Sequence, residues 1–190
     1  MKTIQPVELK ELLKLSRKYG VPRRVMSALP AWPMPRIARG DRRGEVVFAI
    51  ANRKQKILLH TKSFYPNGVF RLPGGGIRWD EKVEDALYRE VEEETGLAVQ
   101  IDRFVAVIEY EVRRKRQPFA TYLFLLNTDG KKPTAQDANE DIAAFKTVTR
   151  AELAAVGQQL RHLPEEWRVW GAFRAIAHDL IVDALAQDSG

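Results

Sequence analysis

Cysteine is absent from this chain of 190 residues. Its absence excludes disulfide bonds, thiol nucleophiles and zinc sites built on cysteine. Long apolar runs are missing too: no stretch approaches the roughly 20 residues of a membrane-spanning helix, and the first residues, MKTIQPVELKEL, carry charges where a secretory signal needs apolar side chains. We therefore expect a cytoplasmic protein with no membrane segment.

The composition is that of a globular protein. Hydrophobic residues make up 45% of the chain and charged residues 29%, which excludes a fibrous repeat or a disordered chain. The length suits one substantial core with terminal additions. We expect an N-terminal helix and basic proline-containing arm over residues 1–43 and one main domain over residues 44–187.

The net charge of +6 is concentrated near the N-terminus, where the first 45 residues hold eleven Lys or Arg against four Asp or Glu. A basic surface attracts phosphate groups, on nucleotides or on a nucleic-acid backbone. The same charge can also be a solvated face with no dedicated partner, and the sequence leaves both interpretations open.

The pattern of apolar and turn-forming residues predicts the order of elements. An amphipathic helix is expected over residues 7–19, followed by an extended, proline-containing arm over residues 29–44. Strands are expected over residues 45–51 and 56–62, which form a hairpin, and over residues 69–72, 99–112, 119–127 and 143–148. Helices are expected over residues 80–95, from Arg150 with a capping box of Thr149 and Glu152, and at the C-terminus around Trp167 and Trp170. This order predicts an α/β sandwich on a mixed sheet.

One stretch, RLPGGGIRWDEKVEDALYREVEEETGL, carries most of the chemistry. Val83, Leu87 and Val91 recur every four residues as the buried stripe of a helix that Gly96 ends. With 3.6 residues per turn, Glu90, Glu93 and Glu94 share one face, whereas Glu92 points elsewhere. Arg89 lies one turn before Glu93 and is expected to pair with it.

Three carboxylates on one helix face need a cation to remain ionised together. Oxygen ligands select Mg²⁺ or Mn²⁺, which typically combine a few carboxylates with substrate phosphates. The glycines at residues 74–76 let the backbone approach this site, and a peptide carbonyl there can be a further ligand. Two rival motifs fail: a dinucleotide fingerprint needs a third glycine or alanine, and a phosphate-binding P-loop needs a Gly-Lys-Ser/Thr that does not follow.

The spacing of these residues resembles the signature of the Nudix hydrolase family. Gly75, Glu81 and the run Arg89-Glu90-Val91-x-Glu93-Glu94-x-Gly96-Leu97 match it at every defined position. The resemblance implies an α/β/α sandwich with a mixed sheet, and an enzyme that hydrolyses a diphosphate linkage with Mg²⁺ or Mn²⁺. We therefore expect a pyrophosphohydrolase whose partner is a small nucleotide-type substrate. Members of this family are often dimers, and the N-terminal helix and arm are a candidate homodimer interface.

The resemblance also implies roles for individual residues. Glu93 and Glu94 would be metal ligands, Glu90 a further ligand or the base for the attacking water, and Gly75 a ligand through its carbonyl oxygen. Arg89 would orient the glutamates. Glu81 would be structural or an outer ligand.

The general base can also come from a loop beyond the signature. The acidic loop with Asp137, Glu140 and Asp141 precedes the last expected strand, where such a loop falls in the family. Glu140 is our candidate base; an exposed acid in a turn is the competing interpretation.

The substrate is the open question. The favoured substrate is a nucleoside diphosphate derivative or nucleoside triphosphate; the alternatives are the 5′ end of RNA and a non-catalytic nucleotide sensor. Hydrolases of ADP-ribose carry a proline some fifteen residues after the signature, and Pro118 comes too late. The basic cluster over residues 113–116 can bind an extra phosphate, or it can be the solvated tip of a hairpin.

Overall fold

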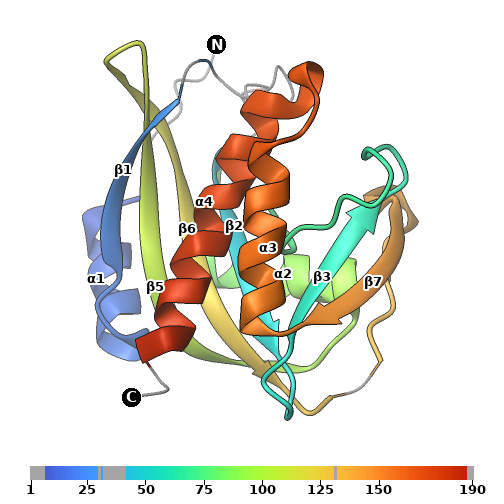
Figure 1. The fold of residues 1–190 in the computed structure, drawn as a ribbon. Helices are drawn as coiled ribbons and strands as arrows, with labels where there is room; N and C mark the ends of the chain where they lie inside the picture. Colours follow the sequence, from blue (N-terminus) through green and yellow to red (C-terminus); the bar gives the residue numbers. More distant parts are fainter. Residues whose placement is uncertain (1–6, 30, 32–41, 131, 188–190) are drawn as a thin grey trace.

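The computed structural model describes residues 7–29, 31, 42–130 and 132–187. Figure 1 shows a mixed sheet between two layers of helices, which confirms the predicted α/β sandwich. The strands are β1 (Arg23–Leu29), β2 (Arg42–Ala51), β3 (Ile57–Lys62), β4 (Gly74–Arg78), β5 (Val99–Val112), β6 (Lys115–Thr128) and β7 (Ile142–Val148). The helices are α1 (Leu9–Tyr19), α2 (Val83–Thr95), α3 (Arg150–Arg161) and α4 (Glu165–Gln187), with a short 3₁₀ helix η1 (Ala138–Glu140).

The sheet has the strand order β1-β5-β6-β2-β3-β7, and β4 pairs with β2 beside this path. Alternate side chains of β2 enter two different cores because successive residues of a strand point to opposite faces. Val46 and Phe48 pack with α1 and α2, whereas Val47 and Ala49 pack with α3 and α4. A strand covered on both faces is apolar throughout, which explains the continuous run in β2.

The predicted hairpin of residues 45–51 and 56–62 is present only at its turn. Strands β2 and β3 share one residue pair, Ala51 with Ile57, and then separate. Beyond that pair β3 runs antiparallel to β7, and β2 runs parallel to β6 and antiparallel to β4. Strands that are adjacent in the sequence need not pair along their length, and here each has other partners in the sheet. The separation makes room for the site described below.

The strand predicted over residues 69–72 is wrong. This segment has one isolated bridge, between His60 and Arg71, and the strand begins later, at the glycines of β4. The glycines were not predicted as a strand, because glycine has a low intrinsic preference for strands. Their lack of side chains instead lets β4 lie close to both β2 and α2. The glycine backbone is thereby fixed beside the signature helix.

The N-terminal region contributes to the same sheet and core. Helix α1 was predicted, but β1 was not; it pairs in parallel with β5 over seven residues. Its basic start and the prolines that follow hid the strand, because the pairing partner lies about 80 residues away. The middle of the predicted extended arm, at residues 30 and 32–41, lies outside the described residues; its first residue belongs to β1 and its last three to β2. The division at residues 43 and 44 stays a prediction.

The other helices and the long hairpin differ from expectation mainly at their ends. Helix α2 begins at Val83 instead of residue 80, and its buried stripe is as predicted. Helix α3 has the predicted capping box between Thr149 and Glu152. The basic loop is shorter than predicted: it is a turn at Arg113 and Arg114, because β6 begins at residue 115. Within the described ranges, no helix combines the length and apolar character needed to cross a membrane.

Candidate active site

A cleft of about 660 Å³ opens where β2 and β3 separate. Its volume lies in the range of small-molecule sites. Strands β2 and β4, helices α2 and α4, and the segments that follow β3 and precede β7 all contribute to its walls. The lining residues are Arg42, Glu45, Lys62, Phe64, Tyr65, Arg71, Gly74, Gly75, Gly76, Glu90, Asn139, Glu140, Asp141, Trp167, Trp170 and Arg174.

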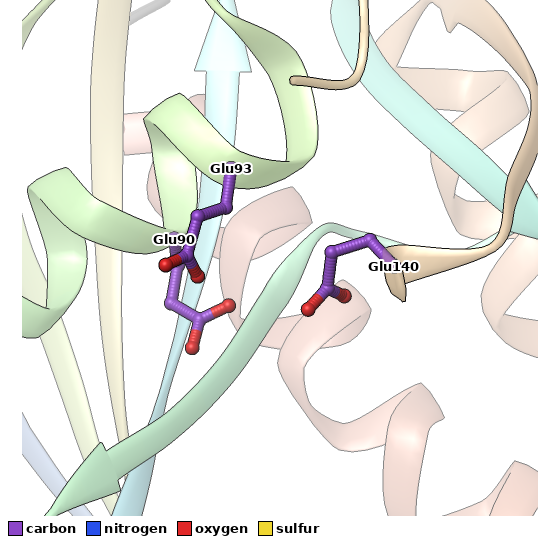
Figure 2. A group of neighbouring side chains, drawn as sticks. All are labelled: Glu90, Glu93 and Glu140. Carbon is purple, nitrogen blue, oxygen red and sulfur yellow. The ribbon is translucent and has the colours of Figure 1, made fainter. Parts of the chain in front are cut away.

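Three carboxylates meet beside this cleft, and two of them, Glu90 and Glu140, line it. Oxygen atoms of Glu90, Glu93 and Glu140 all lie within 4.8 Å of one another, and Figure 2 shows the first two on α2 and the third on the facing loop. Burial and the neighbouring charges of Glu94 and Glu140 raise the pKa of Glu90 to about 7. The Glu90 carboxyl is therefore only partly ionised near neutral pH, and a bound cation would favour its ionised form.

The acidic loop is held in place by the end of α2. The amides of Gln136 and Asp137 donate to the Glu93 carbonyl at 3.0 and 3.2 Å, and the amide of Thr134 donates to the Thr95 carbonyl at 2.8 Å. The last carbonyls of a helix have no partner inside the helix, so they are available to a docking loop. These bonds bring Glu140 to Glu90 and Glu93 across about 47 residues of chain.

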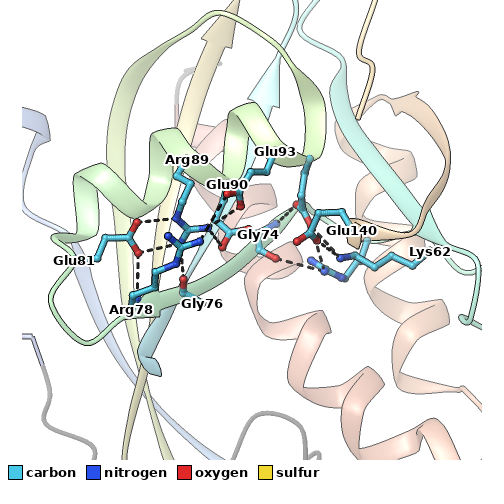
Figure 3. A network of polar contacts seen from close by, with 11 residues as sticks. Lys62, Gly74, Gly76, Arg78, Glu81, Arg89, Glu90, Glu93 and Glu140 are labelled. Atoms are coloured by element: carbon cyan, nitrogen blue, oxygen red, sulfur yellow. Dashed lines mark hydrogen bonds and ion pairs between the residues drawn. The ribbon is translucent and has the colours of Figure 1, made fainter. Parts of the chain in front are cut away.

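Arg89 connects most of the polar groups of the signature (Figure 3). It donates to both carboxylate oxygens of Glu81, at 2.7 and 2.9 Å, and to the Gly76 carbonyl at 2.8 Å. It also donates to Glu90 at 2.7 Å and Glu93 at 2.8 Å, so the contact expected from the spacing is present. A planar guanidinium with this many partners holds both carboxylates in defined orientations.

The glycines of β4 are required by close packing. A Cβ on Gly75 would lie 2.1 Å from Oε2 of Glu90, so no other residue fits without moving that carboxylate. Gly74 has a φ of 149°, and a Cβ there would lie 2.3 Å from the Val46 carbonyl oxygen. The close approach of β4 to α2 therefore depends on both residues.

Glu94 is fully buried and lies apart from the three-carboxylate group. Its Oε2 accepts a 2.8 Å hydrogen bond from the Gly74 amide. Its Oε1 has no hydrogen bond among the described residues; its charged neighbours are the Lys62 Nζ at 3.3 Å and the Arg71 Nη2 at 4.0 Å. Burial raises the pKa of this carboxyl above its usual value. The assignment of Glu94 as a ligand stays a prediction, and its unbonded Oε1 is the atom available for that role.

The donor set suits a hard divalent ion. Every candidate ligand is an oxygen, which favours Mg²⁺ or Mn²⁺ over zinc. Glu90, Glu93 and Glu140 are near enough to share one ion, and the Gly75 backbone lies against the same carboxylates. The residues therefore fit the expected metal.

Several cleft residues were not singled out from the sequence. Lys62 joins the site at the end of β3, where its Nζ lies 2.5 Å from Glu140 Oε2. Arg174 of α4 donates to both carboxylate oxygens of Glu45, at 3.0 and 2.9 Å. Trp167 and Trp170 were interpreted as the packing face of a helix; they pack as expected and also line the cleft. No local pattern distinguishes these residues from ordinary strand and helix positions.

The fold and the carboxylate site define an α/β/α sandwich protein with a candidate divalent-metal centre beside a glycine strand. The model of the NUDIX domain matches residues 41–169. The chain therefore belongs to the Nudix hydrolase family, which confirms the resemblance found in the signature.

Relatives with several different names match the chain. The ADP-ribose pyrophosphatase of Methanocaldococcus jannaschii is 32% identical over 109 residues, covering 57% of this chain and 64% of the relative. The mouse diphosphoinositol polyphosphate phosphohydrolase 3-alpha is 36% identical over 76 residues, covering 40% of this chain and 44% of the relative. The chain thus spans less than two thirds of the length of these curated relatives.

Among solved structures, a Caenorhabditis elegans Ap4A hydrolase matches with a TM-score of 0.53 and 16% identity, covering 76% of this chain and 98% of that one. At this identity the likeness supports the fold alone. The names of the three proteins refer to three different substrates, so the family is defined and the substrate is not.

Proposed function

We propose that this protein is a metal-dependent pyrophosphohydrolase that cleaves the diphosphate linkage of a nucleoside diphosphate derivative or nucleoside triphosphate. The observation that carries the proposal is the group of Glu90, Glu93 and Glu140 at a cleft of ligand size, which Glu90 and Glu140 line. The relative named for ADP-ribose, a nucleoside diphosphate derivative, supports the same class of substrate.

Glu90 and Glu93 are the proposed metal ligands best supported by geometry; Glu94 and the Gly75 carbonyl are carried over from the family signature. When bound, a divalent ion neutralises charge on the diphosphate oxygens and polarises the phosphorus atoms. Arg89 holds the Glu90 and Glu93 carboxylates of α2 in fixed positions beside each other. The protein's main contribution is thus a fixed arrangement of charge around the diphosphate.

Glu140 is the proposed base. It accepts a proton from a water that attacks one phosphorus in line; the new P–O bond forms as the bridging P–O bond breaks, and the second phosphate leaves. The ammonium of Lys62 holds the Glu140 carboxylate at the site. Glu90, the candidate base within the signature, is also paired with a cation, Arg89, and we assign it as a metal ligand.

The test is a screen of nucleoside diphosphate derivatives and triphosphates with Mg²⁺ and Mn²⁺, scoring release of phosphate and pyrophosphate. Glu93→Gln should lower turnover of any substrate found by roughly a hundredfold, the upper effect expected when the environment of a catalytic metal is disturbed. Glu92→Gln is the matched control, because Glu92 is exposed on another side of α2. Near-normal turnover of Glu93→Gln would reject the site.

The basic tip of the β5–β6 hairpin gives no support to the RNA alternative. Arg113 and Arg114 lie at this tip and do not line the cleft, so an RNA 5′ end gains no described contact there. A non-catalytic sensor would release neither product in the same screen.

A further inference from the structure

The cleft contains an aromatic surface that the metal chemistry does not use. Phe64, Tyr65, Trp167 and Trp170 line the same cleft as the carboxylates, and we call these four residues the aromatic wall. Two come from the turn after β3 and two from the first turns of α4, segments about 100 residues apart in sequence. A hydrolase of the diphosphate bond needs none of these rings for charge stabilisation or proton transfer.

The inner part of the aromatic wall is held firmly. The Tyr65 ring lies 4.9 Å from the Trp170 ring and 6.2 Å from the Trp167 ring, and the two tryptophan rings are 5.2 Å apart. The Tyr65 hydroxyl accepts a 2.8 Å hydrogen bond from the buried Arg71. Rings fixed in this way lose little conformational freedom when a ligand binds.

The outer part of the aromatic wall remains accessible. Phe64 is 45% exposed and packs edge-on against Tyr65, with ring centroids 4.9 Å apart. Trp167 is partly buried, whereas Trp170 is only 2% exposed. A large exposed ring at the rim of a cleft leaves apolar area in water, and a flat ligand would cover it.

The charges of the cleft limit how many phosphates it can hold. Its lining has four cationic side chains and four carboxylates. These cations already have partners within the protein: Lys62 pairs with Glu140, Arg174 pairs with Glu45, and Arg71 donates to Tyr65 and to backbone carbonyls. One diphosphate neutralised by a divalent ion suits this balance, whereas a ring with many phosphates would need a cationic surplus.

From these observations we infer that the aromatic wall stacks the base of the substrate, so that the cleft selects nucleotides over base-free phosphates such as phosphorylated inositols. The inference rests on the proposed function, because it assigns the second half of the same cleft. Every nucleobase has a π-face, so stacking on an aromatic side chain binds the class without selecting one base.

The experiment compares nucleoside monophosphates with ribose 5-phosphate, the same phosphosugar without a base. Calorimetric titration with AMP, GMP, CMP and UMP in Mg²⁺ requires no turnover, because none of these compounds contains a diphosphate linkage. We expect at least one nucleotide to bind roughly tenfold more tightly than ribose 5-phosphate, the scale of one stacked base. Equal affinity of all five compounds would overturn the inference.

Substitutions in the aromatic wall test whether it causes the preference for nucleotides over ribose 5-phosphate. Phe64→Leu and Trp167→Leu should each reduce the ratio of nucleotide to ribose 5-phosphate affinity several-fold while leaving the ribose 5-phosphate affinity unchanged. Phe64 is exposed, so its variant remains informative if Trp167→Leu does not fold. Tyr88→Leu is the matched control, since Tyr88 is an exposed aromatic on α2 outside the cleft. An unchanged ratio in Phe64→Leu would place the base elsewhere and reject the aromatic wall.

The two proposals fail in different ways. If Glu93→Gln abolishes turnover but nucleotides show no advantage over ribose 5-phosphate, the hydrolase stands and the aromatic wall does not bind a base. If the aromatic variants lose the nucleotide preference but no diphosphate is hydrolysed, the wall binds nucleotides and the proposed catalytic function is wrong.

Discussion

The two walls of the cleft are specified in different ways. The polar wall, made of β4 and α2, comes from one stretch of about 25 residues, and its hydrogen bonds run within that stretch. The aromatic wall joins the turn after β3 to the start of α4 and has no sequence signature. The contrast shows that the signature part of the phosphate site is encoded in one stretch, to which the tertiary structure adds Glu140 and Lys62. The aromatic wall depends entirely on how distant elements meet.

His178 of α4 joins the two walls and gives the largest expected effect. Its Nδ1 donates to the Arg174 carbonyl at 3.0 Å, and its Nε2 accepts from the Leu72 amide, just before β4, at 3.2 Å. Burial lowers the pKa of this imidazole from 6.5 to about 4. Between these values the unfolded chain binds a proton that the folded protein does not, so stability falls as the pH falls from 6.5 to 4. The shift corresponds to about 3 kcal/mol.

Denaturant unfolding at several pH values measures this loss. His178→Gln should show a smaller decrease in the free energy of unfolding between pH 6.5 and 4 than the unaltered protein. His162→Gln is the control, because His162 is exposed. Buried His60, whose pKa burial also lowers, contributes in the same direction, so some slope should persist in His178→Gln. If the free energy of unfolding depends on pH identically in His178→Gln and in the unaltered protein, His178 is not the group responsible for the loss.

A methyl group at the glycine strand tests the polar wall alone. Gly75→Ala would push a Cβ into the Glu90 carboxylate, and we expect Mn²⁺ affinity and turnover to fall by roughly a hundredfold. Gly20→Ala is a useful contrast: its φ of 89° disfavours alanine, but nothing lies within 4 Å of the added Cβ. That variant should lose stability and keep its metal affinity. A Gly75→Ala protein with normal Mn²⁺ binding would contradict the packing argument.

The smallest expected effect concerns the orientation of the carboxylates. Arg89→Lys keeps the positive charge but loses the two-pronged contact with Glu81 and most of the bonds to Glu90, Glu93 and Gly76. Mn²⁺ affinity should fall about tenfold, the lower effect of losing a group that supports metal ligands. This affinity is measured by titrating the protein with Mn²⁺ and following free Mn²⁺ by electron paramagnetic resonance. Unchanged nucleotide preference over ribose 5-phosphate in this variant would confirm that the two walls act separately.

The predictable parts of the structure follow from short-range periodicity. The buried stripe of α2, the exposed position of Glu92 and the contact of Arg89 with Glu93 are all consequences of 3.6 residues per turn. The parallel strand β1 and the strand character of the glycines could not be predicted. Both depend on partners far along the chain, because β1 pairs with β5 and β4 pairs with β2.

The sequence by itself determined the family, the helix that presents Glu90 and Glu93, and the need for glycine beside them, because each follows from residue identity and local spacing. Only the tertiary structure decided that Glu140 joins them, that Lys62 and Arg174 meet acidic partners, and that four aromatic rings face the same cleft. The physical reason is that a helix repeats through bonds between near neighbours, whereas strand pairing and loop docking bring together residues that no local pattern relates.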